Sequence, residues 1–81
     1  PFNPSTKIDI QTSERNDLGV RIFDATGRLV NTIMDKQLDA GHYTVRWNGL
    51  DSKGHGMPTG VYFIQVQSGV QISTQKMILI K

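Results

Sequence analysis

The chain has 81 residues, no cysteine and a formal net charge of +2. This length predicts one domain, and the absence of cysteine excludes both disulfides and thiolate metal ligands. Acidic and basic residues are interspersed, which argues against the continuous basic surface of a nucleic-acid-binding protein. No segment reaches the roughly 20 apolar residues that a membrane-spanning helix needs.

The first segment, Pro1–Ser5, predicts the extended end of a linker, because each of its two prolines fixes φ. It has neither an initiating Met nor a signal peptide, so we expect the chain to be a piece of a larger protein. Strands are predicted at Thr6–Thr12 and Leu18–Asp24, where apolar residues occupy alternate positions. After the second strand, Asp24-Ala25-Thr26-Gly27 predicts a tight hairpin turn.

The next segment, Arg28–Met34, is apolar but does not keep one parity. Leu29 and Ile33 lie on one face of an ideal strand, and Val30 and Met34 lie on the other. We interpret it as a strand, with a helical turn as the alternative.

Three further strands are predicted at His42–Trp47, Val61–Ser68 and Ile72–Ile80. The last one ends in the continuous apolar run Met77–Ile80, which indicates either burial on both faces or a bulge. The long connection between Asn48 and Gly60 is rich in turn residues. The glycines assigned to turns are Gly27, Gly41, Gly49, Gly54 and Gly60.

Six or seven short strands with turns between them predict an all-β antiparallel sandwich or barrel. In its core, Trp47 is in phase with Tyr43 and Val45, which favours a buried indole over an exposed sugar-binding platform. The predicted core residues are Ile8, Ile10, Val20, Ile22, Tyr43, Val45, Trp47, Tyr62, Ile64 and Val66.

The titratable and nucleophilic residues do not form a catalytic pattern. There is no Gly-x-Ser-x-Gly elbow, and a domain this small has little room to enclose a substrate pocket. His42 and His55 lack the three or four convergent ligands of a metal site. The turn at residues 48–54 brings one carboxylate, Asp51, and contains Lys53, so calcium there is the weaker alternative to no cofactor. We expect a domain that is not an enzyme.

Five stretches in order carry a resemblance to known families. They are Pro1–Thr6, Val20–Val30, Ala40–Gly49, Pro58–Phe63 and Lys76–Lys81. Their order and spacing resemble the type A C-terminal sorting domains of type IX secretion. They also resemble the closely related Ig-like domain named after the flagellar hook-capping protein.

The resemblance implies an Ig-like sandwich of about seven short strands over residues 6–81, following a linker end at residues 1–5. It would be the C-terminal domain of a secreted, multidomain bacterial protein, exported through the periplasm and outer membrane to the medium or cell surface. Any catalysis, for example by a hydrolase, would belong to the upstream domain. The implied partners are that domain, an outer-membrane translocon and a sortase. The implied recognition residues are Gly60, Tyr62, Lys76, Met77, Leu79 and Lys81.

One stretch departs from the sorting pattern, because residues 11–17 are polar throughout. A structural Ig-like spacer that stabilises a neighbouring catalytic domain therefore stays open. A carbohydrate-binding module is a further alternative, because sandwich folds often host such sites. Lys76 and Lys81 also have a plainer interpretation, since lysines on an edge strand prevent unwanted pairing.

Overall fold

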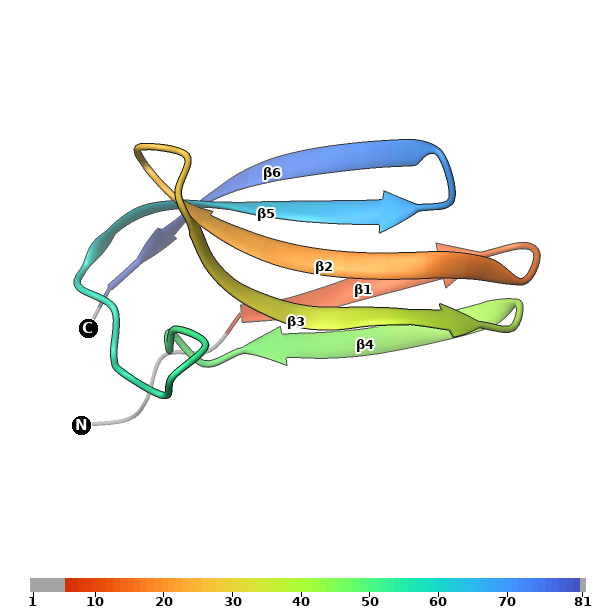
Figure 1. The fold of residues 1–81 in the computed structure, drawn as a ribbon, viewed down its shortest axis with the longest axis horizontal. Coiled ribbons are helices and arrows are strands. Elements are labelled where there is room, and N and C mark those ends of the chain that lie inside the picture. Colours follow the sequence, from red (N-terminus) through yellow and green to blue (C-terminus); the bar gives the residue numbers. More distant parts are fainter. Residues whose placement is uncertain (1–5, 81) are drawn as a thin grey trace.

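The structure is a computed structural model that describes residues 6–80. It contains two antiparallel sheets, one with the strand order β3-β2-β5-β6 and one with the order β1-β4 (Figure 1). The strands are β1 (Thr6–Thr12), β2 (Asn16–Asp24), β3 (Leu29–Leu38), β4 (Gly41–Trp47), β5 (Gly60–Ser68) and β6 (Gln71–Leu79). The predicted all-β antiparallel sandwich is confirmed, with six strands in the described part instead of about seven. The predicted linker end at residues 1–5 lies outside it.

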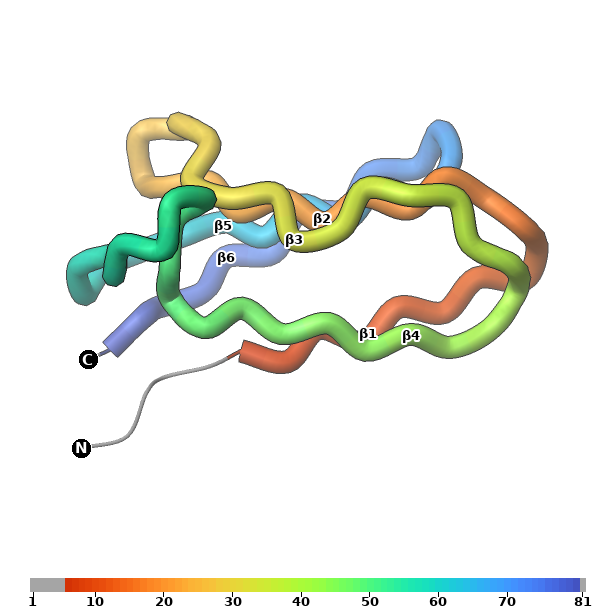
Figure 2. The backbone as a smooth tube through the Cα atoms, turned by 60° about the horizontal axis from the view of Figure 1, so that its bottom comes forward, coloured from red at the N-terminus to blue at the C-terminus, as the bar shows by residue number. Residues whose placement is uncertain are grey.

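The two sheets lie face to face, as Figure 2 shows, and the chain crosses between them at β1–β2, β3–β4 and β4–β5. The core fills the space between the sheets. Its largest fully buried side chains are Trp47, Leu18, Ile22 and Val20. Burial of this apolar surface is the main stabilising contribution, at roughly 25 cal/mol per Å².

The residues assigned to the core from their phase divide into two groups. Ile10, Val20, Ile22, Trp47, Tyr62 and Ile64 are buried, whereas Ile8, Tyr43, Val45 and Val66 are partly buried and pack against them. Leu18, Val30 and Leu79 complete the buried cluster. Leu18 was in phase with Val20 and could have been found from the sequence, whereas Val30 and Leu79 broke their local patterns.

The segment predicted at Arg28–Met34 is a strand and not a helical turn, because β3 runs from Leu29 to Leu38. Its register with β2 shifts twice: Val20 pairs with Met34 but Arg21 with Thr32, and Ile22 pairs with Asn31 but Phe23 with Leu29. Each shift inserts one extra residue into β3, first Ile33 and then Val30. A β-bulge of this kind resets the parity of a strand, so the broken alternation results from two bulges. Val30 is buried, and Ile33 packs against the core.

The apolar end of β6 has a simpler explanation than the sequence suggested. The register between β5 and β6 runs without a shift from Ser68–Gln71 to Gly60–Leu79. Leu79 is buried, while Ile78 is 63% exposed and Ile80 is 70% exposed. The run is neither buried on both faces nor bulged, because alternate side chains of a regular strand point to opposite faces.

Candidate interaction surface

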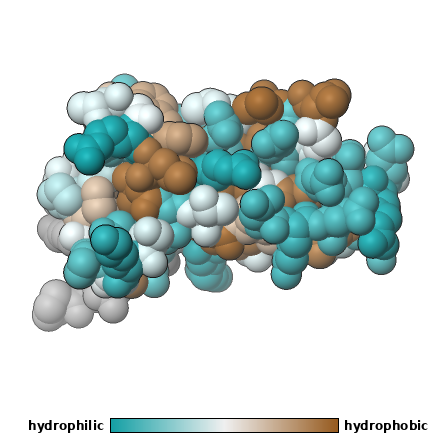
Figure 3. Space-filling view, viewed as in Figure 1, coloured by the Kyte–Doolittle hydropathy of each residue, from teal (hydrophilic) through white to brown (hydrophobic). Residues whose placement is uncertain are grey.

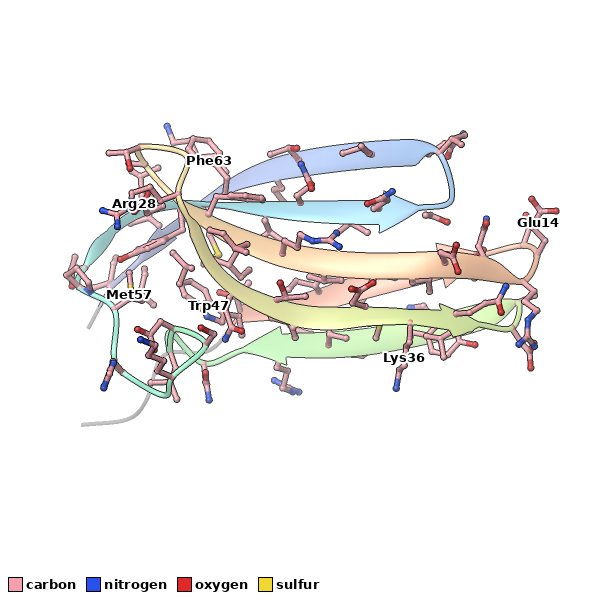
Figure 4. All side chains as sticks on the ribbon, viewed as in Figure 1. Glu14, Arg28, Lys36, Trp47, Met57 and Phe63 are labelled. Atoms are coloured by element: carbon pink, nitrogen blue, oxygen red, sulfur yellow. The ribbon has the colours of Figure 1, made fainter. Side chains whose placement is uncertain are left out.

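One end of the sandwich is fixed by two aromatic residues and the loop between β4 and β5. The rings of Trp47 and Tyr62 meet edge to face, with centroids 5.1 Å apart. Trp47 Nε1–H donates a hydrogen bond to the carbonyl of Leu50 at 2.8 Å. The Tyr62 hydroxyl donates to the carbonyl of Pro58 at 2.6 Å. Figure 4 shows Trp47 and Met57 at this end of the molecule, where Met57 packs against the core.

The bond from Tyr62 to Pro58 forms a tyrosine corner. A tyrosine near the start of a strand that bonds back to the backbone of the preceding connection is a hallmark of immunoglobulin-like sandwiches. The bond explains the spacing of Pro58 and Tyr62 in the sequence. It gives Tyr62 a structural role at the position where the sequence resemblance implied recognition by a partner.

Replacing Tyr62 by Phe should lower the free energy of unfolding by about 1–3 kcal/mol, because the Pro58 carbonyl loses its donor at a partly buried site. The matched control is Tyr43→Phe, which removes a hydroxyl that bonds the Asp39 carbonyl at an exposed site. There water replaces the donor, and we expect a change of about 0.5 kcal/mol or less. Urea unfolding followed by circular dichroism measures both, and equal losses would contradict the corner's role.

Two aspartates organise turns at this same end. Asp24 Oδ1 accepts hydrogen bonds from the hydroxyl and backbone N–H of Thr26 and from the N–H of Arg28. Asp51 Oδ1 accepts from the N–H groups of Lys53 and His55. The pKa of Asp24 is lowered mainly by the hydrogen bond from the Thr26 hydroxyl, and to a lesser extent by the bond from the Arg28 N–H. The bond from the His55 N–H lowers the pKa of Asp51.

These bonds also bear on calcium. The turn at residues 48–54 uses the carboxylate of Asp51 to hold its own backbone. Within residues 6–80, the acidic residues and histidines form no cluster of three or more that could hold a metal ion. That no cofactor binds stays a prediction; addition of calcium followed by a chelator should leave the melting temperature unchanged.

Both pKa shifts predict loss of stability in acid. A carboxyl group whose pKa is lower in the folded state stabilises the protein above its unfolded pKa, here about 3.8, and loses that contribution as the pH falls through the folded pKa. The urea concentration at the midpoint of unfolding should therefore decrease as the pH is lowered from about 5 to about 2. The double variant Asp24→Asn with Asp51→Asn should show a smaller fall. An equal fall in both proteins would contradict this assignment.

Of the residues that the resemblance assigned to recognition, the five within residues 6–80 lie in β5 and β6, at the end that carries the tyrosine corner. Tyr62 and Leu79 are buried, Met77 is partly buried and Lys76 is exposed. Gly60 begins β5 with no positive φ, whereas Gly27, Gly41, Gly49 and Gly54 have positive φ. Lys81 lies outside the described residues. The placements give Tyr62 and Leu79 packing roles and leave Lys76 on the surface.

An exposed apolar patch lies on the outer face of the four-stranded sheet, near the hairpin turn after β2. Cross-strand neighbours share a face, and the register aligns Leu29 with Phe23, Phe23 with Phe63, and Val61 with Ile78. Leu29 is 57% exposed and Ile78 is 63% exposed. The outer patch consists of Phe23, Leu29, Val61, Phe63 and Ile78. Phe63 lies at this end of the sheet in Figure 4. A cluster of this kind suits contact with another protein.

A second, smaller apolar area lies at the opposite end of β6. Figure 3 shows hydrophobic atoms gathered near the turn between β5 and β6. The exposed apolar residues at this turn are Val70, at 97%, and Ile72, at 59%. Most of the surface between the two areas in this view is hydrophilic. No helix in residues 6–80 has the length and apolar character needed to cross a membrane.

Two antiparallel sheets packed face to face, closed by a tyrosine corner, define an immunoglobulin-like β-sandwich domain. The family model of the FlgD Ig-like domain matches residues 2–71, and the chain belongs to this family. It is a structural family, so the domain is not an enzyme, as the sequence predicted.

The fold is also similar to a solved structure, the crystal structure of FlgD from P. aeruginosa. The TM-score is 0.69 with 26% sequence identity, and the match covers 93% of this chain and 59% of that chain. This chain therefore spans less than two thirds of the solved FlgD. No curated protein matches the sequence.

These comparisons correct the function implied by the resemblance. They support the Ig-like domain of the flagellar hook-capping protein and overturn the type IX sorting signal. The translocon and sortase as partners, and export by that route to the cell surface, are wrong with it. The two alternatives, a spacer beside a catalytic domain and a carbohydrate-binding module, do not fit FlgD either.

The physical reason for this error is visible in the fold. The stretches that carried the resemblance mark strands and turns: Val20–Val30 spans the β2–β3 hairpin, and Pro58–Phe63 contains the tyrosine corner. These stretches form the strands and turns that close the sandwich. Two families that share the sandwich share these stretches, so the stretches do not separate their functions.

Proposed function

We propose that this chain is a structural domain of a flagellar hook-capping protein, where it contacts other proteins of the assembly. The observation that carries the proposal is membership of the FlgD Ig-like family over residues 2–71. The outer patch supports it, because exposed apolar clusters rimmed by polar residues mark protein contacts. Arg28 and Lys76 border the patch and add positive charge at its rim.

The proposal is tested in the source bacterium by deleting the gene segment for residues 6–80. Hooks are then counted by electron microscopy of purified hook–basal bodies. We expect the deletion to abolish or strongly reduce hook assembly, because a cap that lacks a contact domain does not support the growing hook. Hooks of normal number and length would overturn the proposal.

A second arm tests the outer patch with substitutions that preserve the strands. Leu29→Thr combined with Ile78→Thr removes its two most exposed residues, and we expect fewer assembled hooks. The matched control is Ile72→Thr, on the same outer face of β6 at its opposite end and 59% exposed. Circular dichroism shows whether each variant stays folded. Equal hook numbers in the patch variant and the control would remove the patch from the interface.

A further inference from the structure

The two sheets are unequal, and part of the larger one lies uncovered. In Figure 1, β1 and β4 lie behind the half of the sheet that contains β2 and β3, and the central part of β6 has no strand behind it. Residues 71–76 of β6 are exposed at every position, on both faces of the strand. Among them Ser73 and Gln75 share the inner face with Val66 and Ile64, their partners on β5. This inner face is open where a sandwich is normally closed.

The uncovered face forms one wall of a groove of about 620 Å³. The opposite wall is β1. Its apolar lining on the inner faces comes from both sheets: Ile8 and Ile10 from β1, Ile64 and Val66 from β5, and Met77 from β6. The polar lining on β6 comes from Gln71, Ser73 and Gln75, side chains that offer amide and hydroxyl groups but no charge.

The β1 side of the groove offers backbone hydrogen bonds. Among the described strands β1 pairs with β4 alone, from Thr6–Trp47 to Thr12–Gly41. Its other edge is therefore open over seven residues, a length of about 23 Å. Neither proline nor a register shift interrupts β1, and of the features that protect an edge it carries one lysine, Lys7. An open edge beside an apolar groove is the arrangement that accepts an added strand.

We propose that an extended segment of the same polypeptide, from outside residues 1–81, fills this groove as a further strand. It pairs its backbone with the open edge of β1 and covers the inner face of β6. Alternate side chains of the segment are apolar and face Ile8, Ile64 and Met77. The side chains that face β6 are uncharged, because Gln71, Ser73 and Gln75 supply no charge to pair with; the charged residues that line the groove, Lys7 and Asp9, lie on β1. A seven-stranded sandwich results, which is the strand number of the smallest immunoglobulin type.

The size of the contact indicates that the strand is tethered. A separate molecule needs an interface of roughly 1,200 Å² or more to stay bound, and one strand over an edge of seven residues gives much less. A segment of the same chain is held at an effective concentration in the millimolar range, so a small contact is sufficient. The solved FlgD provides such additional chain, since 59% of it is matched here. The inference concerns the fold alone and is independent of the hook-capping proposal.

Single cysteines test the proposal cleanly, because the chain contains none. Ser73→Cys places a thiol on the inner face of β6, and Thr74→Cys places one on the outer face beside it; both positions are exposed. Each is introduced into the 81-residue chain and into the complete product of the gene. The rate of thiol labelling is measured at low protein concentration. We expect the rate at position 73 to be at least tenfold lower in the complete product, with position 74 equally reactive in both.

Three outcomes would overturn the proposal. Equal labelling rates at position 73 in the two proteins mean that no segment covers the groove. Protection of the 81-residue chain that grows with its own concentration means that a second copy fills the groove. Protection that requires the addition of another protein means that a partner supplies the strand. Hydrogen exchange of the β1 amides gives a second measurement without any substitution: alternate amides should slow at least tenfold in the complete product.

Discussion

Replacement of Trp47 by Ala should lower the free energy of unfolding by about 3–5 kcal/mol. Trp47 is 1% exposed, so the substitution leaves a cavity at the end of the core. It also removes the edge-to-face contact with Tyr62 and the hydrogen bond to the Leu50 carbonyl. Within residues 6–80, that carbonyl then keeps the bond from the Asn31 side chain, at 3.1 Å. The loss is large for a domain whose total stability is roughly 4–12 kcal/mol.

Urea unfolding monitored by circular dichroism measures the loss. Arg46→Ala is the matched control, because Arg46 is the exposed neighbour on the same strand, and we expect a change of about 0.5 kcal/mol or less. Trp47→Phe fills part of the cavity and keeps the measurement possible if the Ala variant does not fold. A Trp47→Ala variant that unfolds at the same urea concentration as the parent would contradict burial of the indole.

The second large effect is expected at Leu79, where Ala should lower the free energy of unfolding by about 2–5 kcal/mol. Leu79 is 3% exposed and packs against Gly49. An ideal Cβ at Gly49 would lie 3.4 Å from Leu79 Cδ1, so glycine gives Leu79 its space. Positive φ, +79° at Gly49, is the second reason for glycine there. The end of β6 is thus held to the β4–β5 loop by packing.

The neighbouring residue is a strict control for this prediction. Ile78 lies on the same strand, is also aliphatic, and is 63% exposed on the outer face. Ile78→Ala should therefore change stability by about 0.5 kcal/mol. The two substitutions remove comparable side chains, so the difference between them isolates burial. If Leu79→Ala and Ile78→Ala lower the free energy of unfolding equally, the side chains at the end of β6 do not alternate between a buried and an exposed face.

Local pattern predicted much of this fold because a half-buried strand shows its burial in its own sequence. Ile8 and Ile10 alternate with polar residues in β1, and Tyr43, Val45 and Trp47 do so in β4. The Asp24–Gly27 turn was also predictable. Its side chain and backbone bonds are local, from Thr26 and Arg28 to Asp24 and from the Gly27 N–H to the Asp24 carbonyl.

Function was less accessible, since the residues that marked the family are the ones that close the sandwich. Tyr62 reaches Pro58 four residues earlier in the chain, and this bond exists in the fold whatever the domain binds. The outer patch could not be found from the sequence either. Its five residues come from four strands, and only the register places Leu29, Phe23 and Phe63 in one row.

The sequence by itself determined the regularly alternating strands β1, β2, β4 and β5, the hairpin after β2, and the buried phase of Trp47, because each depends on residues within a few positions of one another. Tertiary structure decided the rest. The two bulges that bury Val30 and aim Ile33 at the core exist only against β2. The inner face of β6 is open because the β1–β4 sheet, from distant parts of the chain, covers the other half of the larger sheet. Alternation reports which side chains share a face, but whether that face is covered depends on segments far away in the sequence.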